Sequence, residues 1–283
     1  VAITVAAGMP EPRTYIEDDG TAWIPYWNGG DTLAVMVDGN YASPSSLINQ
    51  ASDGRTATFS GTLKNVDDGE HTLTAWYPKG LKAGRSESVM KYQLAAEQTL
   101  PSLTSFDPSM GLLVGLPAAF TVADGKANVD NMRFRRVFTV VKVTLKDEST
   151  LLEGRKVSRV ALTAASTLTG KANVEITTGD ITRWENASAT VAGNYAGDDF
   201  TIDGANSAFL LVNPTTLSAG SVLTLDVTTD DDNLLISKSV NLSGEVVFAE
   251  NKVTSLNFTL TDDNVQDKSS VTSYTWDFST AEW

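Results

Sequence analysis

The chain of 283 residues contains no cysteine and a single histidine, His71. The absence of cysteine excludes disulfide bonds, thiolate metal ligands and cysteine nucleophiles. A single histidine excludes a metal site built from several imidazoles and leaves at most one histidine-based acid or base. The Gly-x-Ser-x-Gly sequence that presents the nucleophile of many hydrolases is also absent. We therefore expect a protein that is not an enzyme, with no cofactor and no catalytic residues.

Positive charge is scarce as well. The chain has 21 lysines and arginines against 35 aspartates and glutamates, which gives a net charge of −14. Such a chain repels the phosphates of nucleic acids and an anionic membrane surface, so we expect neither as a partner. No apolar run approaches the roughly 20 residues that a membrane-spanning helix needs. The sequence also lacks the basic and then apolar start of a secretion signal, and we expect any such signal to have been removed.

Strand-forming patterns are abundant. Threonine, valine and serine are frequent, and short runs of alternating apolar and polar residues recur between clusters of glycine, aspartate and asparagine. Residues 56–63 and 71–78 are clear examples. Short strands at a spacing of roughly 8–12 residues are typical of β-sandwiches. Apolar residues at the three- and four-residue spacing of a helix are almost absent, and only residues 94–98 are compatible with a short helical turn.

The predicted strands are too many for one sandwich of about seven, so we predict an all-β protein with two tandem β-sandwich domains and a C-terminal extension. The first domain covers residues 1–130, and its residues 1–13 form a first strand and the loop after it. The second domain covers residues 131–263 and opens with one long strand at 132–146. Residues 264–283 form a tail. No linker rich in proline or serine separates the domains, so we expect them to pack together.

His71 follows the acidic segment 67–70 and could act as a base paired with one of its carboxylates. Because no nucleophile accompanies it, we interpret it as a surface histidine. Acidic clusters, such as the run that begins at Asp230, lie between predicted strands beside glycine or asparagine. Aspartate favours turns because its side chain accepts hydrogen bonds from nearby backbone groups. We favour solvated turns, with a calcium site formed by oxygens from several loops as the alternative.

Two further clusters have both a structural and a functional interpretation. Arg133, Arg135 and Arg136 form a basic cluster in an acidic chain. Three positive charges in a chain of this net negative charge are too few to indicate a nucleic-acid-binding surface. We therefore interpret the cluster as a salt link between the domains. The aromatic cluster consists of Trp23, Tyr26 and Trp27. These rings could stack on a sugar, but large amphipathic rings are common in sandwich cores, and we favour a place in the core.

The segment Pro12-Arg13-Thr14 lies between the first predicted strand and the next. Its prolines cannot donate ladder hydrogen bonds, which favours an extended and exposed loop. An exposed arginine in such a loop is a good substrate for a trypsin-like protease. On the residues alone, however, an ordinary loop arginine is the preferred interpretation.

Several stretches, taken in their order and spacing, resemble the fimbrillin family, the subunits of type V pili of Gram-negative bacteria. The matching stretches are Arg13-Thr14 and residues 27–31, 59–61, 74–78, 98, 105–107, 132–143 and 209–215. The resemblance spans roughly residues 10–260. It implies two transthyretin-like β-sandwiches and a non-enzymatic subunit of an extracellular pilus. It also implies a lipoprotein precursor, attached to the outer membrane by a lipid on a cysteine upstream of Val1 and by no other insertion.

The resemblance further implies how such a subunit assembles. In shaft subunits an arginine-specific protease cuts the loop after the first strand. Loss of that strand opens a groove, and the C-terminal strand of another subunit fills this groove. On this sequence the cut falls between Arg13 and Thr14. The displaced strand is residues 1–7, with Val1, Ile3 and Val5 towards the core. The donor strand is residues 273–278, with Tyr274, Trp276 and Phe278 on one face.

Alternatives remain open at this point. The tail departs from the family's pattern, and it is either a donor strand or the start of another β-domain. In the second case the chain is a tip or accessory subunit. A surface glycan-binding module and a calcium-dependent adhesin are the other functional interpretations. The expected partners are other pilin subunits in a homo- or heteropolymer, the arginine-specific protease, and a host protein or glycan.

Overall fold

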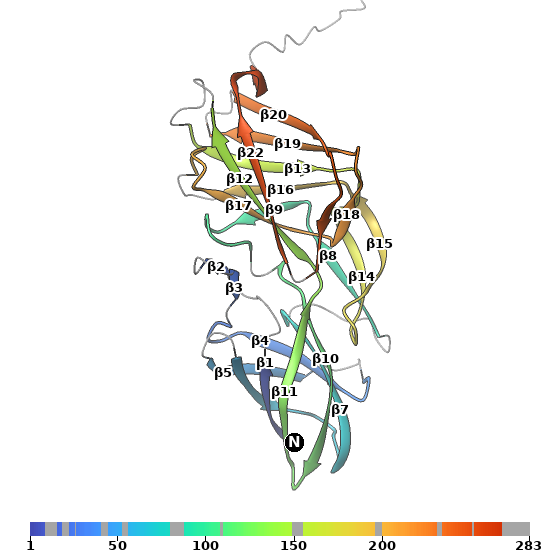
Figure 1. The fold of residues 1–283 in the computed structure, drawn as a ribbon. Helices are drawn as coiled ribbons and strands as arrows, with labels where there is room; N and C mark the ends of the chain where they lie inside the picture. Colours follow the sequence, from blue (N-terminus) through green and yellow to red (C-terminus); the bar gives the residue numbers. More distant parts are fainter. Residues whose placement is uncertain are drawn as a thin grey trace, which may run out of the picture.

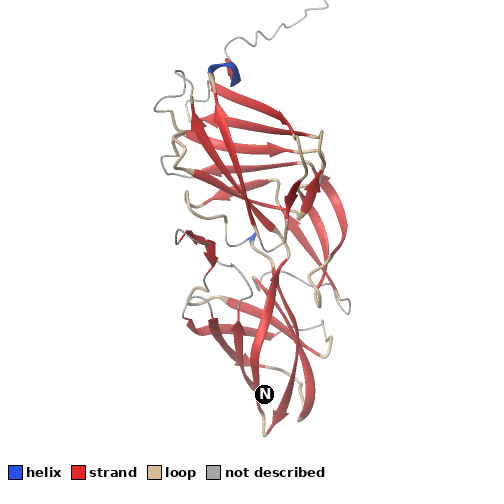
Figure 2. Cartoon of the chain, viewed as in Figure 1, coloured by secondary structure: helices blue, strands red, loops and turns tan. Residues whose placement is uncertain are grey.

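The computed structural model describes residues 1–8, 16–18, 23–25, 27–40, 45–52, 56–79, 88–107, 110–148, 155–195, 200–230, 234–250 and 252–267, with only the backbone of 16–18 and 23–25. Within these ranges strands predominate, no α-helix occurs, and a 3₁₀ turn lies at Asp262–Asn264 (Figure 2). The predicted all-β class is confirmed. The helical turn predicted at 94–98 is wrong, because Leu94 ends one strand and Glu97 begins the next. No helix among the described residues has the length and apolar character needed to cross a membrane.

A closed barrel is formed by strands from the first half of the chain (Figure 1). Around the barrel the strands are β1 (Ala2–Gly8), β11 (Lys126–Arg136), β10 (Leu113–Ala123), β7 (Gly69–Tyr77), β4 (Thr32–Val37), β5 (Ser45–Ser52) and β6 (Thr56–Thr62). In place of the predicted sandwich of two separate sheets, this half has one sheet that closes on itself, because β1 pairs with both β6 and β11. Alternation identifies a strand but not its partners, so the sequence could not show this closure. A small hairpin pairs β2 (Ile16–Asp18) with β3 (Trp23–Pro25).

Several smaller sheets form the other half of the structure. The larger ones are ordered β23-β20-β19-β13-β16-β9, β17-β12-β22 and β15-β14-β8, and β18 pairs with β21. These strands are β8 (Val89–Leu94), β9 (Glu97–Leu100), β12 (Thr139–Asp147), β13 (Val157–Thr163), β14 (Thr169–Glu175), β15 (Ile181–Ser188), β16 (Thr190–Tyr195), β17 (Ser207–Val212), β18 (Thr215–Leu217), β19 (Val222–Thr229), β20 (Leu234–Asn241), β21 (Val246–Phe248), β22 (Val253–Leu260) and β23 (Val265–Asp267).

Strand pairing does not follow the predicted division at residue 130. β8 and β9 precede that position, yet they pair with β14 and β16 of the second half. The single strand predicted at 132–146 is two strands, because β11 ends in the barrel at Arg136 and β12 begins in another sheet at Thr139. Val137 and Phe138 between them are both buried, which interrupts the alternation of buried and exposed residues.

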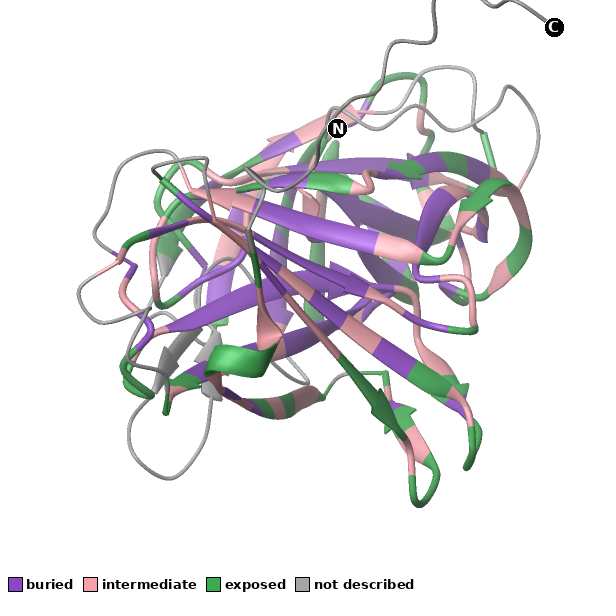
Figure 3. Ribbon diagram, turned by 90° about the horizontal axis from the view of Figure 1, so that it is seen from above, coloured by how far each residue is buried: buried purple, intermediate pink, exposed green. Residues whose placement is uncertain are grey.

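The two halves share an apolar core in addition to having one each. The barrel core contains Ile3, Val5 and Phe59, whereas Leu162 and Leu210 lie in the core of the second half. The shared core joins side chains on the outside of the barrel to β8, β12, β14 and β17 (buried residues are purple in Figure 3). Its members include Met36, Trp76, Met90, Phe138 and Phe209. The expected packing of the two halves is therefore present.

Candidate functional site

The first strand, β1, lies between β11 and β6 and closes the barrel (Figure 1). It runs antiparallel to β6, from Ala2 opposite Thr62 to Gly8 opposite Thr56. It runs parallel to β11 on its other side. We call the space that β1 occupies between β6 and β11 the slot. Without β1, both strands bordering the slot would expose a row of unpaired backbone N–H and C=O groups.

The side chains of β1 alternate between the core and solvent. Ile3, Val5 and Ala7 are at most 2% exposed, whereas Ala2 and Thr4 are exposed. Val1 is partly buried and packs at the margin of the same core. Ile3 and Val5 thus face the core as the alternation predicts. The inward face of the strand is apolar along its whole length, so the slot combines an apolar floor with two hydrogen-bonding edges.

Hydrogen bonds fix the beginning of β1. The backbone nitrogen of Val1 donates to the carbonyl oxygen of Leu63 at 3.1 Å, and the N–H of Leu63 donates to the Val1 carbonyl oxygen at 2.8 Å. The N–H of Ala2 donates to Gly125 in the β10–β11 turn at 2.9 Å. At the other end Gly8 lies opposite Arg133 of β11. The strand is therefore held along its full described length.

Trp27 closes the end of the barrel at which β1 finishes. Its ring is 3% exposed and meets the rings of Phe59, Tyr77 and Phe134 edge-on, at centroid distances of 5.0, 5.6 and 5.6 Å. Edge-to-face pairs of this kind stabilise a core beyond their apolar area. Gly8, the last residue of β1, pairs with Arg133 of β11, and Phe134 follows Arg133 in that strand. Because Trp27 contacts Phe134, the chain leaves the barrel after Gly8 and returns at Trp27 on the same side.

Hydrogen bonds to the side chain of Asp31, the residue before β4, fix the start of that strand. The hydroxyl of Tyr77 donates to Asp31 Oδ1 at 3.0 Å, and the N–H of Asn28 donates to Asp31 Oδ2 at 2.8 Å. Burial raises the pKa of Asp31, although these hydrogen bonds oppose the shift. Burial also raises the pKa of the Tyr77 hydroxyl. The core interpretation of Trp27 is confirmed, which removes this ring from any sugar-stacking surface. Tyr26 and the Trp23 side chain lie outside the described residues.

The residues predicted to be cut and to donate a strand lie outside the described part of the chain. These are Arg13 and Thr14 in the loop, and Tyr274, Trp276 and Phe278 in the tail. The described residues fix only the two ends of that loop, Gly8 and Trp27, apart from the short β2–β3 hairpin. The proteolytic site and the donor strand therefore remain predictions.

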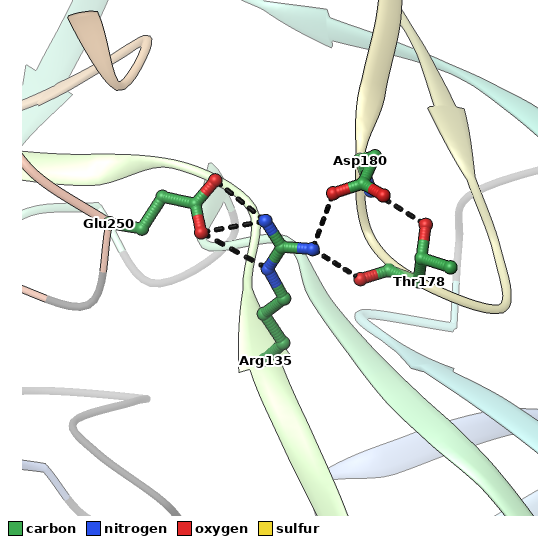
Figure 4. A network of polar contacts seen from close by, with 4 residues as sticks. All are labelled: Arg135, Thr178, Asp180 and Glu250. Atoms are coloured by element: carbon green, nitrogen blue, oxygen red, sulfur yellow. Dashed lines mark hydrogen bonds and ion pairs between the residues drawn. The ribbon is translucent and has the colours of Figure 1, made fainter.

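Arg135 of the basic cluster connects the two halves of the structure (Figure 4). Its Nη2 lies 2.6 Å from Glu250 Oε2, and its Nη1 lies 2.6 Å from both Asp180 Oδ1 and the Thr178 carbonyl oxygen. The hydrogen bond from Arg135 lowers the pKa of Asp180. This confirms the predicted salt link for Arg135. Of its two neighbours, Arg133 is exposed and Arg136 is buried with its guanidinium 5.2 Å from the centre of the Phe106 ring.

The carboxylate that His71 contacts lies outside the acidic segment 67–70. The Nδ1 of His71 lies 2.6 Å from Asp38 Oδ2, in the turn after β4, and its Nε2 lies 2.9 Å from the Asp67 carbonyl oxygen. Both partners accept hydrogen bonds, and a neutral imidazole can donate from only one nitrogen. The hydrogen bond to Asp38 accordingly raises the pKa of His71, and the same bond lowers that of Asp38. The pair is 33 residues apart in sequence, which is why spacing could not reveal it.

The described residues contain no group of three or more histidines, aspartates or glutamates that could hold a metal ion. Asp230 is exposed in the turn after β19, and its N–H donates to the Lys156 carbonyl oxygen at 2.9 Å. Asp231 and Asp232 lie outside the described residues. The calcium alternative therefore has no ligand set in the part of the chain that the structure describes.

Comparison with known proteins points to one family. The family model described as fimbrillin-like matches residues 14–276. A solved structure from Bacteroides ovatus, whose proposed role is cell adhesion, shares 14% identity at a TM-score of 0.61, with 94% of each chain covered. A structure from Bacteroides uniformis with the same proposed role shares 15% identity at a TM-score of 0.57, again with 94% of each chain covered. A third, from Bacteroides fragilis, shares 12% identity at 0.56 and covers 98% of this chain and 99% of that one. A search of curated proteins finds no match.

Proposed function

This chain belongs to the fimbrillin-like family, and from that premise we propose that it is a structural and adhesive subunit of a cell-surface pilus. In this proposal the subunit assembles when proteolysis frees β1 and another subunit's strand enters the slot. Solved structures of the same fold with a proposed role in cell adhesion support an extracellular role in attachment or assembly. No catalytic function forms part of the proposal.

The observation that carries the proposal is the position of β1 in the barrel. Both edges of this strand are bonded to other strands, β6 on one side and β11 on the other. A cut in the loop after Gly8 would leave it attached by non-covalent contacts alone. An incoming strand could then restore both ladders and the apolar floor, which is how strand addition gives affinity and register.

The expected strength of these contacts fits a strand that stays in place until it is replaced. Full burial of Ile3 and Val5 contributes about 1.5–3 kcal/mol each, and the ladder hydrogen bonds add to this. An intact chain therefore keeps β1 in the slot. After a cut, the same contacts hold β1 as a bound peptide, which a competing strand can displace.

The remaining parts of the scheme follow the family resemblance. We propose a cut between Arg13 and Thr14 by an arginine-specific protease, and a lipoprotein precursor delivered to the outer membrane. We further propose that the barrel closed by β1 and the sheets of the second half, which include β8 and β9, correspond to the two transthyretin-like units that the resemblance implies. In the tail, Tyr274, Trp276 and Phe278 are the candidate donor residues for a neighbouring subunit. If the tail instead begins a further domain, the chain is a tip or accessory subunit.

Limited proteolysis tests this proposal directly. Trypsin at low dose should cut first after Arg13, because the proline-containing segment around it is expected to be an extended, exposed loop, whereas Arg133 and Arg135 lie in β11, which must open before cleavage. N-terminal sequencing should find a fragment that begins at Thr14, and size-exclusion chromatography should show assembly of the cut chain only. An Arg13→Gln variant should stay monomeric after the same treatment, whereas an Arg133→Gln control in β11 should behave as the unmodified chain. First cleavage elsewhere, or identical behaviour of cut and uncut chains, would contradict the proposal.

A further inference from the structure

His71 connects two turns of the barrel at the end where β1 begins. One is the turn after β4, which contains Asp38, and the other is the turn between β6 and β7, which contains Asp67. A cleft of about 260 Å³ lies at these turns, and Asp38, Asp67 and His71 all line it. On its other side the imidazole packs beside the ring of Phe120 in β10, at a centroid distance of 5.6 Å.

The turn that contains Asp38 is fastened to β7 by hydrogen bonds of its own. The N–H of Asp38 donates to the Thr72 carbonyl oxygen at 3.0 Å, and the N–H of Thr72 donates to Asp38 Oδ1 at 2.8 Å. Val37, the residue before Asp38, pairs with Leu73 in the ladder between β4 and β7. The carboxylate oxygen that faces His71 therefore has a fixed position.

The turn between β6 and β7 holds the start of β1. Its first residue, Leu63, is 2% exposed and exchanges two backbone hydrogen bonds with Val1, at 2.8 and 3.1 Å. Val66 of the same turn packs at the margin of the barrel core, as Val1 does. The contact of 2.9 Å between His71 Nε2 and the Asp67 carbonyl oxygen ties this turn to β7. His71 is thus connected to β1 through residues 63–67.

The protonation state of His71 decides whether both of its hydrogen bonds form. An imidazolium donates from both nitrogens and satisfies both acceptors, whereas a neutral imidazole has one N–H. That N–H stays on Nδ1, because a hydrogen bond to the Asp38 carboxylate is stronger than one to a neutral carbonyl. Nε2 then directs a lone pair at the Asp67 carbonyl oxygen, and the two acceptors repel each other.

The charges around the imidazole are mainly negative. Among the described residues that line the clefts on the two sides of His71, the charged ones are Asp38, Lys64, Asp67 and Glu70, and Asp68 follows Asp67 in the turn. The cleft residues from β4 and β10 are uncharged; they are Val35, Met36, Val37, Ala119, Phe120 and Thr121. The hydrogen bond to Asp38, with a smaller contribution from Asp67, raises the pKa of His71.

Resting on the proposed function, we propose that His71 is a pH-sensitive latch on β1. While the imidazole is protonated, it holds residues 63–67 against β7, and these residues hold the start of β1 in the slot. When it loses its proton, the turn moves away from β7 and Val1 loses support. The latch is fully closed below the unfolded pKa near 6.5 and opens as pH rises through the higher folded pKa. Exchange of β1 is then faster at alkaline pH.

Hydrogen exchange of the Leu63 amide, read by NMR on the intact chain, tests the latch without cleavage. Its protection, corrected for the intrinsic exchange rate, should fall about tenfold between pH 6 and pH 9, which is the worth of one hydrogen bond from a charged donor. The Val157 amide, which donates to the Phe200 carbonyl oxygen at 2.7 Å in the second half, is the reference and should keep its protection. No loss at Leu63, or an equal loss at both amides, would overturn the inference.

Asp38→Asn separates the latch from a general effect of pH. Asparagine tolerates the left-handed φ of 51° at this position, and its oxygen still accepts from Thr72. Its NH₂ group donates to a neutral Nδ1, so the imidazole proton moves to Nε2 and the bond to Asp67 forms at any pH. Protection of Leu63 should therefore stay at its acidic level up to pH 9, and His71→Gln should likewise show no step. A step that persists in either variant would come from another group and would overturn the inference.

Release of a labelled β1 segment from the cut chain tests the link to exchange. The release rate of the native sequence should rise about tenfold between pH 6 and pH 9, and that of Asp38→Asn should stay constant. Equal rates at the two pH values in the native sequence would overturn the inference. A segment that leaves at neither pH would contradict strand exchange itself, and the Leu63 amide of the intact chain would then decide the latch separately.

Discussion

The contribution of β1 to stability can be measured with one pair of substitutions. Val5→Ala removes two methyl groups from a side chain that is fully buried between Phe59 and Val129. At about 0.8 kcal/mol per buried CH₂ group, with an added cost for the cavity, we expect a loss of about 2–3 kcal/mol in the free energy of unfolding. The neighbouring Thr4→Ala changes an exposed side chain on the same strand and should cost less than about 1 kcal/mol.

Urea unfolding of the intact chain, followed by tryptophan fluorescence, gives both values. In the chain cut after Arg13, the same loss should weaken the hold on the β1 peptide about 30- to 150-fold, since each 1.4 kcal/mol is a factor of ten. A dissociation assay with a fluorescently labelled β1 segment measures this. Equal effects of Val5→Ala and Thr4→Ala on either quantity would refute the assignment of an apolar floor to the slot.

Three further predictions concern the supports of the slot and the link between the halves. Trp27→Ala should cost about 3–5 kcal/mol in urea unfolding, because a buried ring at the end of the barrel is lost; an effect below 1 kcal/mol would contradict its role as a core residue. Arg135→Gln should lower stability by about 1 kcal/mol, and by less at high salt, with exposed Arg133→Gln as the control; equal effects of the two would contradict the salt link. His71 has a raised pKa when folded, so its contribution is fully present below its unfolded pKa near 6.5 and is lost as pH rises through the folded pKa. Stability measured from pH 6 to 9 should therefore fall through this step in the native chain and not in His71→Gln, and parallel curves would contradict the assignment.

The strands of this protein could be predicted from the sequence because their side chains alternate. Residues 56–63 and 71–78 lie largely within β6 and β7, and Ile3 and Val5 face the core as alternation requires. Alternation carries no information about partners, however. The closure of the barrel by β1, and the pairing of β8 and β9 with the second half, depend on contacts between residues far apart in sequence.

The polar contacts were less predictable for the same reason. An interface role for the arginine cluster could be inferred, but the choice of Arg135 depends on Asp180 and Glu250, which lie 45 and 115 residues away. The pairing of His71 with Asp38 likewise depends on the pairing of β7, which contains His71, with β4, which the Asp38 turn follows.

Exchange of β1 in the cut chain tests the central claim most directly. The chain cut after Arg13 is incubated with an isotope-labelled peptide of residues 1–13, and native mass spectrometry follows the mass of the complex. The account predicts that one labelled peptide replaces the unlabelled β1 segment in each cut molecule, while the intact chain takes up none. A cut chain that retains its original segment indefinitely, or an intact chain that binds the peptide equally well, would contradict the claim that β1 is a replaceable strand.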